Sequence, residues 1–144
     1  MTSEAVTATG QDTKPVPTPQ VDSQPFWAAT RNGQLRLQRC AACGRFQFPP
    51  RLICSHCGSA DVVWKPVAGT GHIYSFTIVQ RPPTPAFAQD VPYVVALVDL
   101  DEGPRMMTNV IGCDPTDVYV SMRVRARFVP REDQTLVMFE CEPS

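Results

Sequence analysis

Two closely spaced pairs of cysteines are the residues of this chain that could do chemistry. They follow the pattern Cys-x2-Cys, ten residues, Cys-x2-Cys, and they are Cys40, Cys43, Cys54 and Cys57. Each tight turn can present two thiolates to one ion, and four thiolates complete a tetrahedral zinc site. Because no position is left for water or substrate, the sequence predicts one structural zinc ion per chain. An iron ion with the same four thiolates is the alternative metal.

The residues around the cysteine pairs favour a metal site over redox chemistry. A pair of thioredoxin-like dithiols is the competing interpretation, but no βαβ pattern surrounds either pair. Gly44 and Gly58 follow the two pairs, where they are expected to let the backbone turn and to direct amides toward the sulfurs. His56 could replace a cysteine, but four cysteines suffice, so we expect a solvated side chain.

The sequence predicts no catalytic residue. Cys113 and Cys141 are expected to be half-buried residues at strand ends, because no histidine lies beside either to activate a nucleophile. The carboxylates Asp99 and Asp101 flank a turn, where a solvated hairpin tip explains them better than acid/base catalysis. His72 begins a strand, and a structural role is expected for it. No phosphate loop or nucleophile elbow is present in the sequence.

Composition indicates one globular unit of mainly β structure. The chain has 144 residues, 43% hydrophobic and 19% charged, and 15 prolines against 8 glycines favour loops over long helices. Its start lacks a signal-peptide pattern, and the longest apolar run, YVVALV, is too short to span a bilayer. A cytoplasmic protein without membrane contact is therefore expected. In that compartment six cysteines suggest metal or redox use rather than a disulfide framework.

Positive charge is concentrated around the cysteine pairs. The net charge of −1 argues against a general polyanion binder, yet residues 23–60 contain five arginines and no acidic residue. A solvated surface and a site for phosphate or an acidic partner are both consistent with this run. Arg123, Arg125 and Arg127 alternate with apolar residues and should share one side of a strand, where the same two interpretations apply.

The chain divides into four predicted regions. Residues 1–21 are expected to be a disordered tail rich in Pro and Thr, and residues 22–34 a short aromatic helix. Asp22 or Ser23 can cap that helix, Pro25 suits its first turn, and Asn32-Gly33 supplies its stop. Residues 35–68 are expected to form the zinc ribbon, and residues 69–144 a barrel.

The barrel region contains five predicted strands with a short helical break, DPTDV, between the third and the fourth. This is the element order of a five-stranded OB fold. The strands YVVALV and LVMF are apolar on both faces, so the outer face is expected to need a covering element or a partner protein.

In their order along the chain, these parts resemble the DUF35 family. The resemblance covers residues 23–142 and rests on C-x2-C-G-x4-P-P-R followed by Y-S-F-T-x-V-x-R-P-P-x-P-A-F. It implies an OB fold with a rubredoxin-like zinc ribbon. It also implies a non-catalytic accessory subunit that binds a thiolase-superfamily enzyme acting on acyl-CoA. In one arrangement of the family the DUF35 domain accompanies a MaoC-like hydratase and an aldolase that shortens steroid side chains.

The implied role suggests two groups of contact residues. Partner binding is expected at Phe26, Trp27, Arg31, Phe46 and Phe48. Contact with CoA or with an acidic partner is expected at Arg45, Arg51, Arg81, Pro82 and Phe87. The alternative function is nucleic-acid binding, which the arginine-rich run favours. The near-zero net charge and the scarcity of aromatic residues on the barrel strands argue against it.

Overall fold

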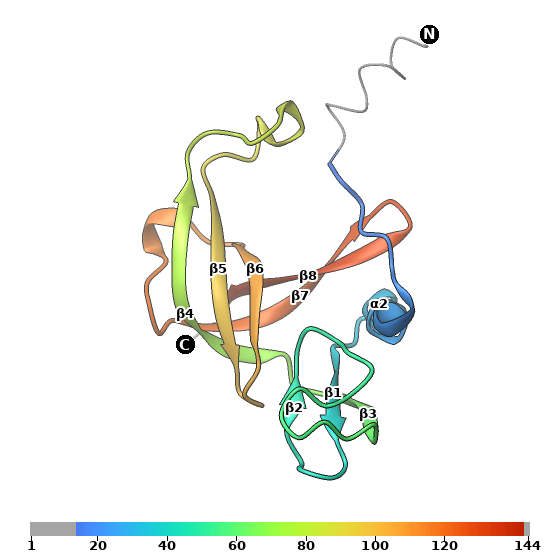
Figure 1. Ribbon diagram of the computed structural model, residues 1–144. Coiled ribbons are helices and arrows are strands. Elements are labelled where there is room, and N and C mark those ends of the chain that lie inside the picture. The colour runs from blue at the N-terminus through green and yellow to red at the C-terminus, as the bar shows by residue number, and fades with distance from the viewer. Residues whose placement is uncertain (1–13, 143–144) are drawn as a thin grey trace, which may run out of the picture.

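The computed structural model describes residues 14–142 and consists mostly of strands, with one short α-helix near the N-terminus (Figure 1). The chain passes from the helix into a three-stranded ribbon and then into a five-stranded barrel, which confirms the predicted order of elements. Much of the predicted tail, residues 1–13, lies outside the described residues. Its described part is tied to the barrel, because Lys14 pairs with Asp90 at 2.5 Å and Arg131 donates to the Pro15 carbonyl at 3.0 Å.

The aromatic helix, α2 (Gln24–Arg31), follows a 3-10 helix, η1 (Val21–Ser23). Pro25 occupies its first turn, and Gly33 with a φ of 73° ends it, as predicted. The cap differs, because the Ser23 hydroxyl turns back and accepts from the Gln20 amide at 3.0 Å instead of capping α2. A helix of eight residues needs tertiary packing. α2 obtains it by contacting β1, β7 and β8 through its buried face.

The ribbon is a small antiparallel sheet in the order β2-β1-β3. Its strands are β1 (Arg36–Cys40), β2 (Phe46–Gln47) and β3 (Val62–Pro66). Cys40 ends β1 opposite Val62, so the first cysteine pair begins where the sheet ends. Leu37 is fully buried and belongs to the same apolar cluster as the barrel interior. The ribbon is therefore packed against the barrel rather than attached by a linker.

The barrel closes in the order β4-β5-β6-β8-β7. Its strands are β4 (Thr70–Val79), β5 (Tyr93–Leu100), β6 (Arg105–Ile111), β7 (Arg123–Arg131) and β8 (Gln134–Cys141). All neighbours are antiparallel except β6 and β8, which run parallel. The 3-10 helix η2 (Pro85–Phe87) lies in the β4–β5 loop, and η3 (Pro115–Asp117) occupies the predicted break. This arrangement confirms the predicted five-stranded OB fold.

One apolar core joins the barrel, α2 and the ribbon. Alternate residues of β5 point inward, as period-two strand geometry requires. Phe139 of β8 and Val124 of β7 are fully buried as well. Phe26 of α2 and Leu37 of β1 complete the cluster. Within residues 14–142, no helix is long and apolar enough to cross a membrane.

Candidate metal centre and arginine surfaces

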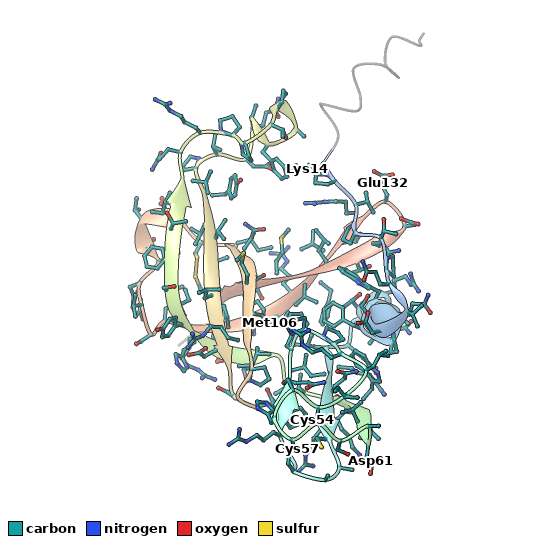
Figure 2. All side chains as sticks on the ribbon, viewed as in Figure 1. Lys14, Cys54, Cys57, Asp61, Met106 and Glu132 are labelled. Atoms are coloured by element: carbon teal, nitrogen blue, oxygen red, sulfur yellow. A yellow bond between two sulfur atoms is a disulfide. The ribbon has the colours of Figure 1, made fainter. Side chains whose placement is uncertain are left out.

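The four predicted ligands lie together at the end of the ribbon. Their sulfurs are all within 4.8 Å of one another, with Cys40 to Cys57 at 3.6 Å and Cys43 to Cys54 at 3.7 Å. A tetrahedron with Zn–S bonds of about 2.3 Å has sulfur–sulfur edges of about 3.8 Å. The four side chains therefore fit a tetrahedral zinc ion. Protein sulfurs would then fill every coordination position of that ion. Figure 2 shows Cys54 and Cys57 at the opposite end of the molecule from Lys14.

Backbone amides surround the buried sulfurs. The Cys40 sulfur accepts from the Cys43 amide at 3.4 Å. The Cys54 sulfur accepts from the amides of His56 at 3.3 Å and Cys57 at 3.4 Å. These donors favour the thiolate form that a metal requires.

The glycines after the pairs act differently from the prediction. Their amides donate to carbonyl oxygens, Gly44 to Cys40 at 2.8 Å and Gly58 to Cys54 at 2.9 Å, rather than to sulfurs. Both glycines have a φ of 79°, a left-handed conformation that closes each turn. The sulfur-directed amides thus come from the cysteines and His56.

The amide donors lower the pKa of both buried thiols. For Cys40, the Cys43 amide is the main cause. Burial opposes ionisation of Cys54, but the amides of Cys57 and His56 outweigh it and lower the pKa to about 6. Both shifts favour the thiolate form, which is the form that binds a metal cation.

The residues expected to bind a partner divide into buried and accessible ones. Phe26 is only 5% exposed and packs edge-on to Trp27, with ring centroids 5.1 Å apart. It is a core residue of this structure, so little of its ring is accessible to a partner. Trp27, Phe46 and Phe48 are half-buried and keep accessible surface. Arg31 is exposed, and its Nη1 donates to Gln134 Oε1 at 3.3 Å.

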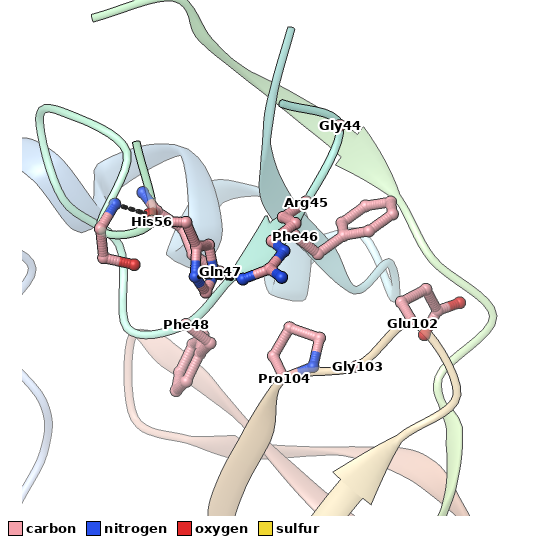
Figure 3. Close-up of a pocket in the computed structure, with 10 residues that line it drawn as sticks. Gly44, Arg45, Phe46, Gln47, Phe48, His56, Glu102, Gly103 and Pro104 are labelled. Atoms are coloured by element: carbon pink, nitrogen blue, oxygen red, sulfur yellow. Dashed lines mark hydrogen bonds between the residues drawn. The ribbon is translucent and has the colours of Figure 1, made fainter. Parts of the chain in front are cut away.

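A cavity of about 490 Å³ lies between the ribbon and the β5–β6 turn (Figure 3). Arg45, Phe46 and His56 line it from the ribbon side, and Glu102 lines it from the turn. Arg45 Nη1 is 3.3 Å from His56 Nδ1, which joins the loops of the two cysteine pairs. His56 is exposed, as expected. One Glu102 oxygen accepts from the Ala68 amide at 3.1 Å, whereas the other is buried without a partner within the described chain.

The residues expected to contact CoA or an acidic partner do not form one site. Arg45 and Arg51 belong to the ribbon, whereas Arg81, Pro82 and Phe87 belong to the β4–β5 loop. Figure 1 shows this loop and the ribbon at opposite ends of the barrel. These residues therefore lie on two separate surfaces of the molecule.

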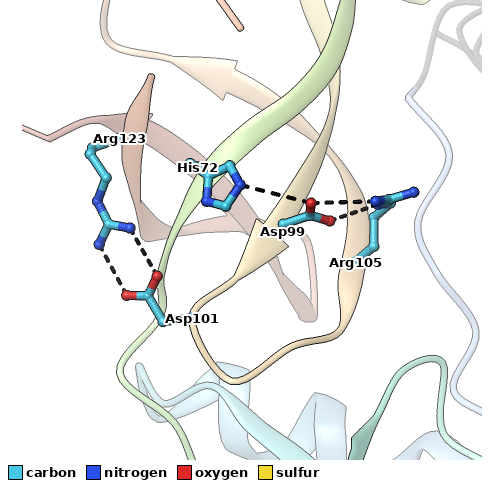
Figure 4. Close-up of polar contacts among 5 residues, drawn as sticks. All are labelled: His72, Asp99, Asp101, Arg105 and Arg123. Atoms are coloured by element: carbon cyan, nitrogen blue, oxygen red, sulfur yellow. Dashed lines mark hydrogen bonds and ion pairs between the residues drawn. The ribbon is translucent and has the colours of Figure 1, made fainter. Parts of the chain in front are cut away.

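The arginine stripe of β7 is paired within the chain. Arg123 makes two hydrogen bonds to Asp101, at 2.8 and 3.0 Å, and Arg125 and Arg127 both contact Glu140. Elsewhere on the barrel, Arg105 of β6 binds Asp99 of β5 at 2.6 Å (Figure 4). The three arginines of β7 are therefore exposed but share two carboxylates of the chain, which makes them less available to bind a ligand phosphate.

Asp101 has a depressed pKa and provides a test of these pairs. Hydrogen bonds from Arg123 and Thr70 lower its pKa from 3.8 to about 2. A depressed carboxyl pKa contributes stability that is present above pH 3.8 and is lost as the pH falls through about 2. Because the pair is exposed, we expect Asp101→Asn to lower the free energy of unfolding at pH 7 by no more than about 1 kcal/mol.

Urea denaturation at a series of pH values measures that difference. We expect the gap in unfolding free energy between the Asp101→Asn variant and the unmodified chain to shrink below pH 3.8 and to vanish only below about pH 2. Asp117→Asn, on the exposed η3, is the control and should show no such gap. If the difference in unfolding free energy between Asp101→Asn and the unmodified chain stays constant across the acid range, the ion pair with Arg123 does not cause that difference.

Cys113 and Cys141 form a disulfide, which sequence analysis did not predict. They are half-buried at the ends of β6 and β8, as expected, but they are not separate residues. The parallel pairing of Ile111 with Glu140 brings the two strand ends together, with Cα atoms of the cysteines 6.4 Å apart. Neither sulfur is therefore a free nucleophile in this structure.

Known proteins share both parts of the chain. Two family models match: the rubredoxin-like zinc ribbon domain of ChsH2 over residues 27–63, and the C-terminal OB-fold domain of ChsH2 over residues 64–129. A solved structure named Ltp2-ChsH2(DUF35) aldolase aligns with a TM-score of 0.79 and 38% identity. The alignment covers 88% of this chain and 98% of that one.

Curated relatives with the same parts come from bacteria and archaea. The 3-oxo-4,17-pregnadiene-20-carboxyl-CoA hydratase alpha subunit of Mycobacterium tuberculosis is 33% identical over 124 residues, which is 86% of this chain and 39% of the relative. A DUF35 domain-containing scaffold protein of Methanothermobacter thermautotrophicus is 34% identical over 91 residues, covering 62% of this chain and 68% of the relative. The chain thus spans less than two fifths of the hydratase subunits that it matches.

Proposed function

Because this chain belongs to the DUF35 family, with the zinc ribbon and OB fold of the ChsH2 type, we propose that it is an accessory subunit of an acyl-CoA-processing enzyme. The observation that carries the proposal is the alignment over 98% of the DUF35 chain of a solved aldolase at 38% identity. In this role the chain binds its partner and holds a surface in place, and the partner performs the reaction.

The chemistry of the described residues is consistent with a structural role. The four clustered cysteines offer a closed metal site, which supplies shape and no open coordination position. Asp99 and Asp101 are held in ion pairs with Arg105 and Arg123. A zinc ion, when bound, would fix the two loops of the ribbon relative to each other, and with them the side chains of Arg45 and His56.

The proposed partner is a thiolase-superfamily enzyme, and a MaoC-like hydratase is a further member of the proposed complex. The first is supported by the solved aldolase, and the second by the relative that is named as a hydratase alpha subunit. That relative's name also supports a steroid side-chain CoA thioester as the substrate class. The half-buried aromatics Trp27, Phe46 and Phe48 are the proposed partner contacts.

Contact with CoA is proposed at the cavity between the ribbon and the β5–β6 turn. Arg45 and His56 place two nitrogen-bearing side chains at one wall, where they could receive a phosphate. Arg51 is a neighbouring cation on the ribbon. Arg81, Pro82 and Phe87 at the other end of the barrel form a second candidate contact, which such a subunit would offer to its partner or to CoA.

Affinity capture of the tagged chain from its native cell extract, followed by mass spectrometry, tests the accessory role. We expect a thiolase-superfamily enzyme in a fixed ratio to the chain, and elution that does not require nuclease treatment. Recovery of nucleic acid or ribosomal proteins in its place would contradict the proposal and favour the nucleic-acid alternative. A mock-tagged extract serves as the control for nonspecific capture.

A further inference from the structure

The loop between the two cysteine pairs exposes adjacent large apolar side chains. Leu52 is 73% exposed and Ile53 is 51% exposed. Exposed aliphatic surface costs about 25 cal/mol per Å² relative to burial, so two such side chains in one loop favour a partner that covers them. The core of the chain does not bury these two side chains, because neither residue belongs to its apolar cluster.

Two buried glutamines hold this loop in place. Gln38 of β1 is 4% exposed and binds both backbone groups of Arg51, its Nε2 donating to the carbonyl at 2.7 Å and its Oε1 accepting from the amide at 2.8 Å. Gln47 of β2, 5% exposed, donates to the Ile53 carbonyl at 3.3 Å and accepts from the Ser55 amide at 2.8 Å. The two side chains also bond to each other at 2.6 Å.

This arrangement orders the loop before any partner arrives. A loop that is already fixed loses less conformational entropy on binding, so its apolar side chains can contribute more to affinity. Residues 51–55 are therefore a preformed element rather than a flexible segment that happens to carry apolar residues.

The exposed Arg51 adds a positive charge at the start of this loop. In the part of the chain that the structure describes, the ion pairs of arginines involve Arg105, Arg123, Arg125 and Arg127, all on barrel strands. The ribbon arginines make no such pair among these residues. Arg39 bonds to the Gly44 carbonyl, and Arg45 contacts His56. An exposed apolar pair that follows directly on an exposed guanidinium group, Arg51, is complementary to an apolar hollow rimmed by carboxylates.

We propose that Arg51, Leu52 and Ile53 form a docking tip that inserts into such an acidic-rimmed apolar hollow on the partner enzyme. The inference rests on the proposed function for the existence of that partner. It adds which surface binds and what chemistry the partner must offer. Aliphatic side chains do not provide the stacking platforms that single-stranded nucleic acid uses, so a protein surface suits the tip better.

Binding of the purified chain to the captured thiolase-superfamily subunit, measured by calorimetry, tests the tip. The test variants are the double variant Leu52→Ser with Ile53→Ser, and Arg51→Glu. Their matched controls are Val120→Ser, at a side chain of the η3–β7 loop that is 56% exposed, and Lys65→Glu, the same charge reversal at an exposed residue of β3. We expect the double variant to bind about 30-fold more weakly, the fold-change of a hot-spot residue.

Arg51→Glu should weaken binding and make the dissociation constant less sensitive to salt, whereas both controls should bind as the unmodified chain does. Zinc content and urea denaturation of each variant establish that the ribbon is intact. Intact tip variants that bind normally, or a loss confined to Lys65→Glu, would overturn the tip while leaving the accessory role in place. Failure of the unmodified chain to bind would overturn both. Self-association that the double variant abolishes would identify a second copy as the occupant.

Discussion

Replacing Cys54 with serine is expected to release the metal and to unfold the ribbon. Cys54 is buried and its sulfur accepts two backbone amides, so the chain loses both a metal bond and a satisfied acceptor. A structural zinc ion contributes on the order of 10 kcal/mol to the folding of a small zinc domain. Zinc analysis should fall from one ion per chain to a small fraction of that.

The consequence should extend beyond the ribbon. Because Leu37 of β1 shares the core with the barrel, an unfolded ribbon would also expose apolar barrel surface. Hydrogen exchange resolved by residue should therefore show β1 to β3 losing protection first, with the barrel strands weakened but still exchanging slowly. A chelator applied to the unmodified chain should reproduce the pattern.

His56→Ala is the matched control for the metal centre. His56 lies inside the second cysteine pair, but the four sulfurs already fit a complete tetrahedron. We expect this variant to keep one zinc ion per chain. Retention of zinc and of ribbon protection in Cys54→Ser, or loss of both in His56→Ala, would contradict the four-cysteine site.

Phe26→Ala is expected to lower the free energy of unfolding by about 3–5 kcal/mol, the range for truncating a buried phenylalanine. The ring is 5% exposed, and its centroid lies 5.1 Å from that of Trp27 and 5.5 Å from that of Phe48. Its removal would leave a cavity where helix, ribbon and barrel meet. Urea denaturation followed by circular dichroism measures the loss.

Phe87→Ala is the control, because Phe87 is a half-buried aromatic of the β4–β5 loop, next to Tyr93. We expect it to cost less than about half as much, since less of the ring is removed from water. Equal losses in the two variants would show that α2 is attached to the surface and does not belong to the core.

The metal centre and the order of elements could be predicted because their signals are local. Each cysteine pair lies within one tight turn, and the two pairs are separated by a short loop, so their spacing alone limits where the sulfurs can be. The strands of the barrel carry their alternation within single segments, as β5 shows. The break before β7 is marked by Asp114-Pro115, where Asp114 accepts from the Thr116 amide at 2.9 Å.

The cross-strand partners could not be predicted, because they depend on register. Arg125 lies directly opposite Glu140, and Arg123 reaches Asp101 beyond the end of β5, yet neither carboxylate is near its arginine in the sequence. The disulfide follows from the parallel contact of β6 with β8, which has no local signal either. Such pairs become visible only when the barrel closes.

The burial of individual side chains could not be predicted from the sequence either. Phe26 and Trp27 are adjacent on a short helix, and the sequence does not say which of them turns inward. Gln38 lies in an alternating strand where a polar residue suggests solvent, yet it is buried because the Arg51 backbone satisfies its amide. A signal did exist, since two glutamines occupy the strands on either side of the first cysteine pair.

Acyl-CoA turnover by the captured complex tests the accessory role most directly. The partner enzyme is assayed alone, after the chain has been stripped from it, and again after purified chain is added back, with the purified chain alone as a third sample. The account predicts no turnover by the chain alone, reduced turnover by the stripped partner, and recovery on addition of the chain. Turnover by the chain alone, or a partner whose activity is the same without it, would contradict the account.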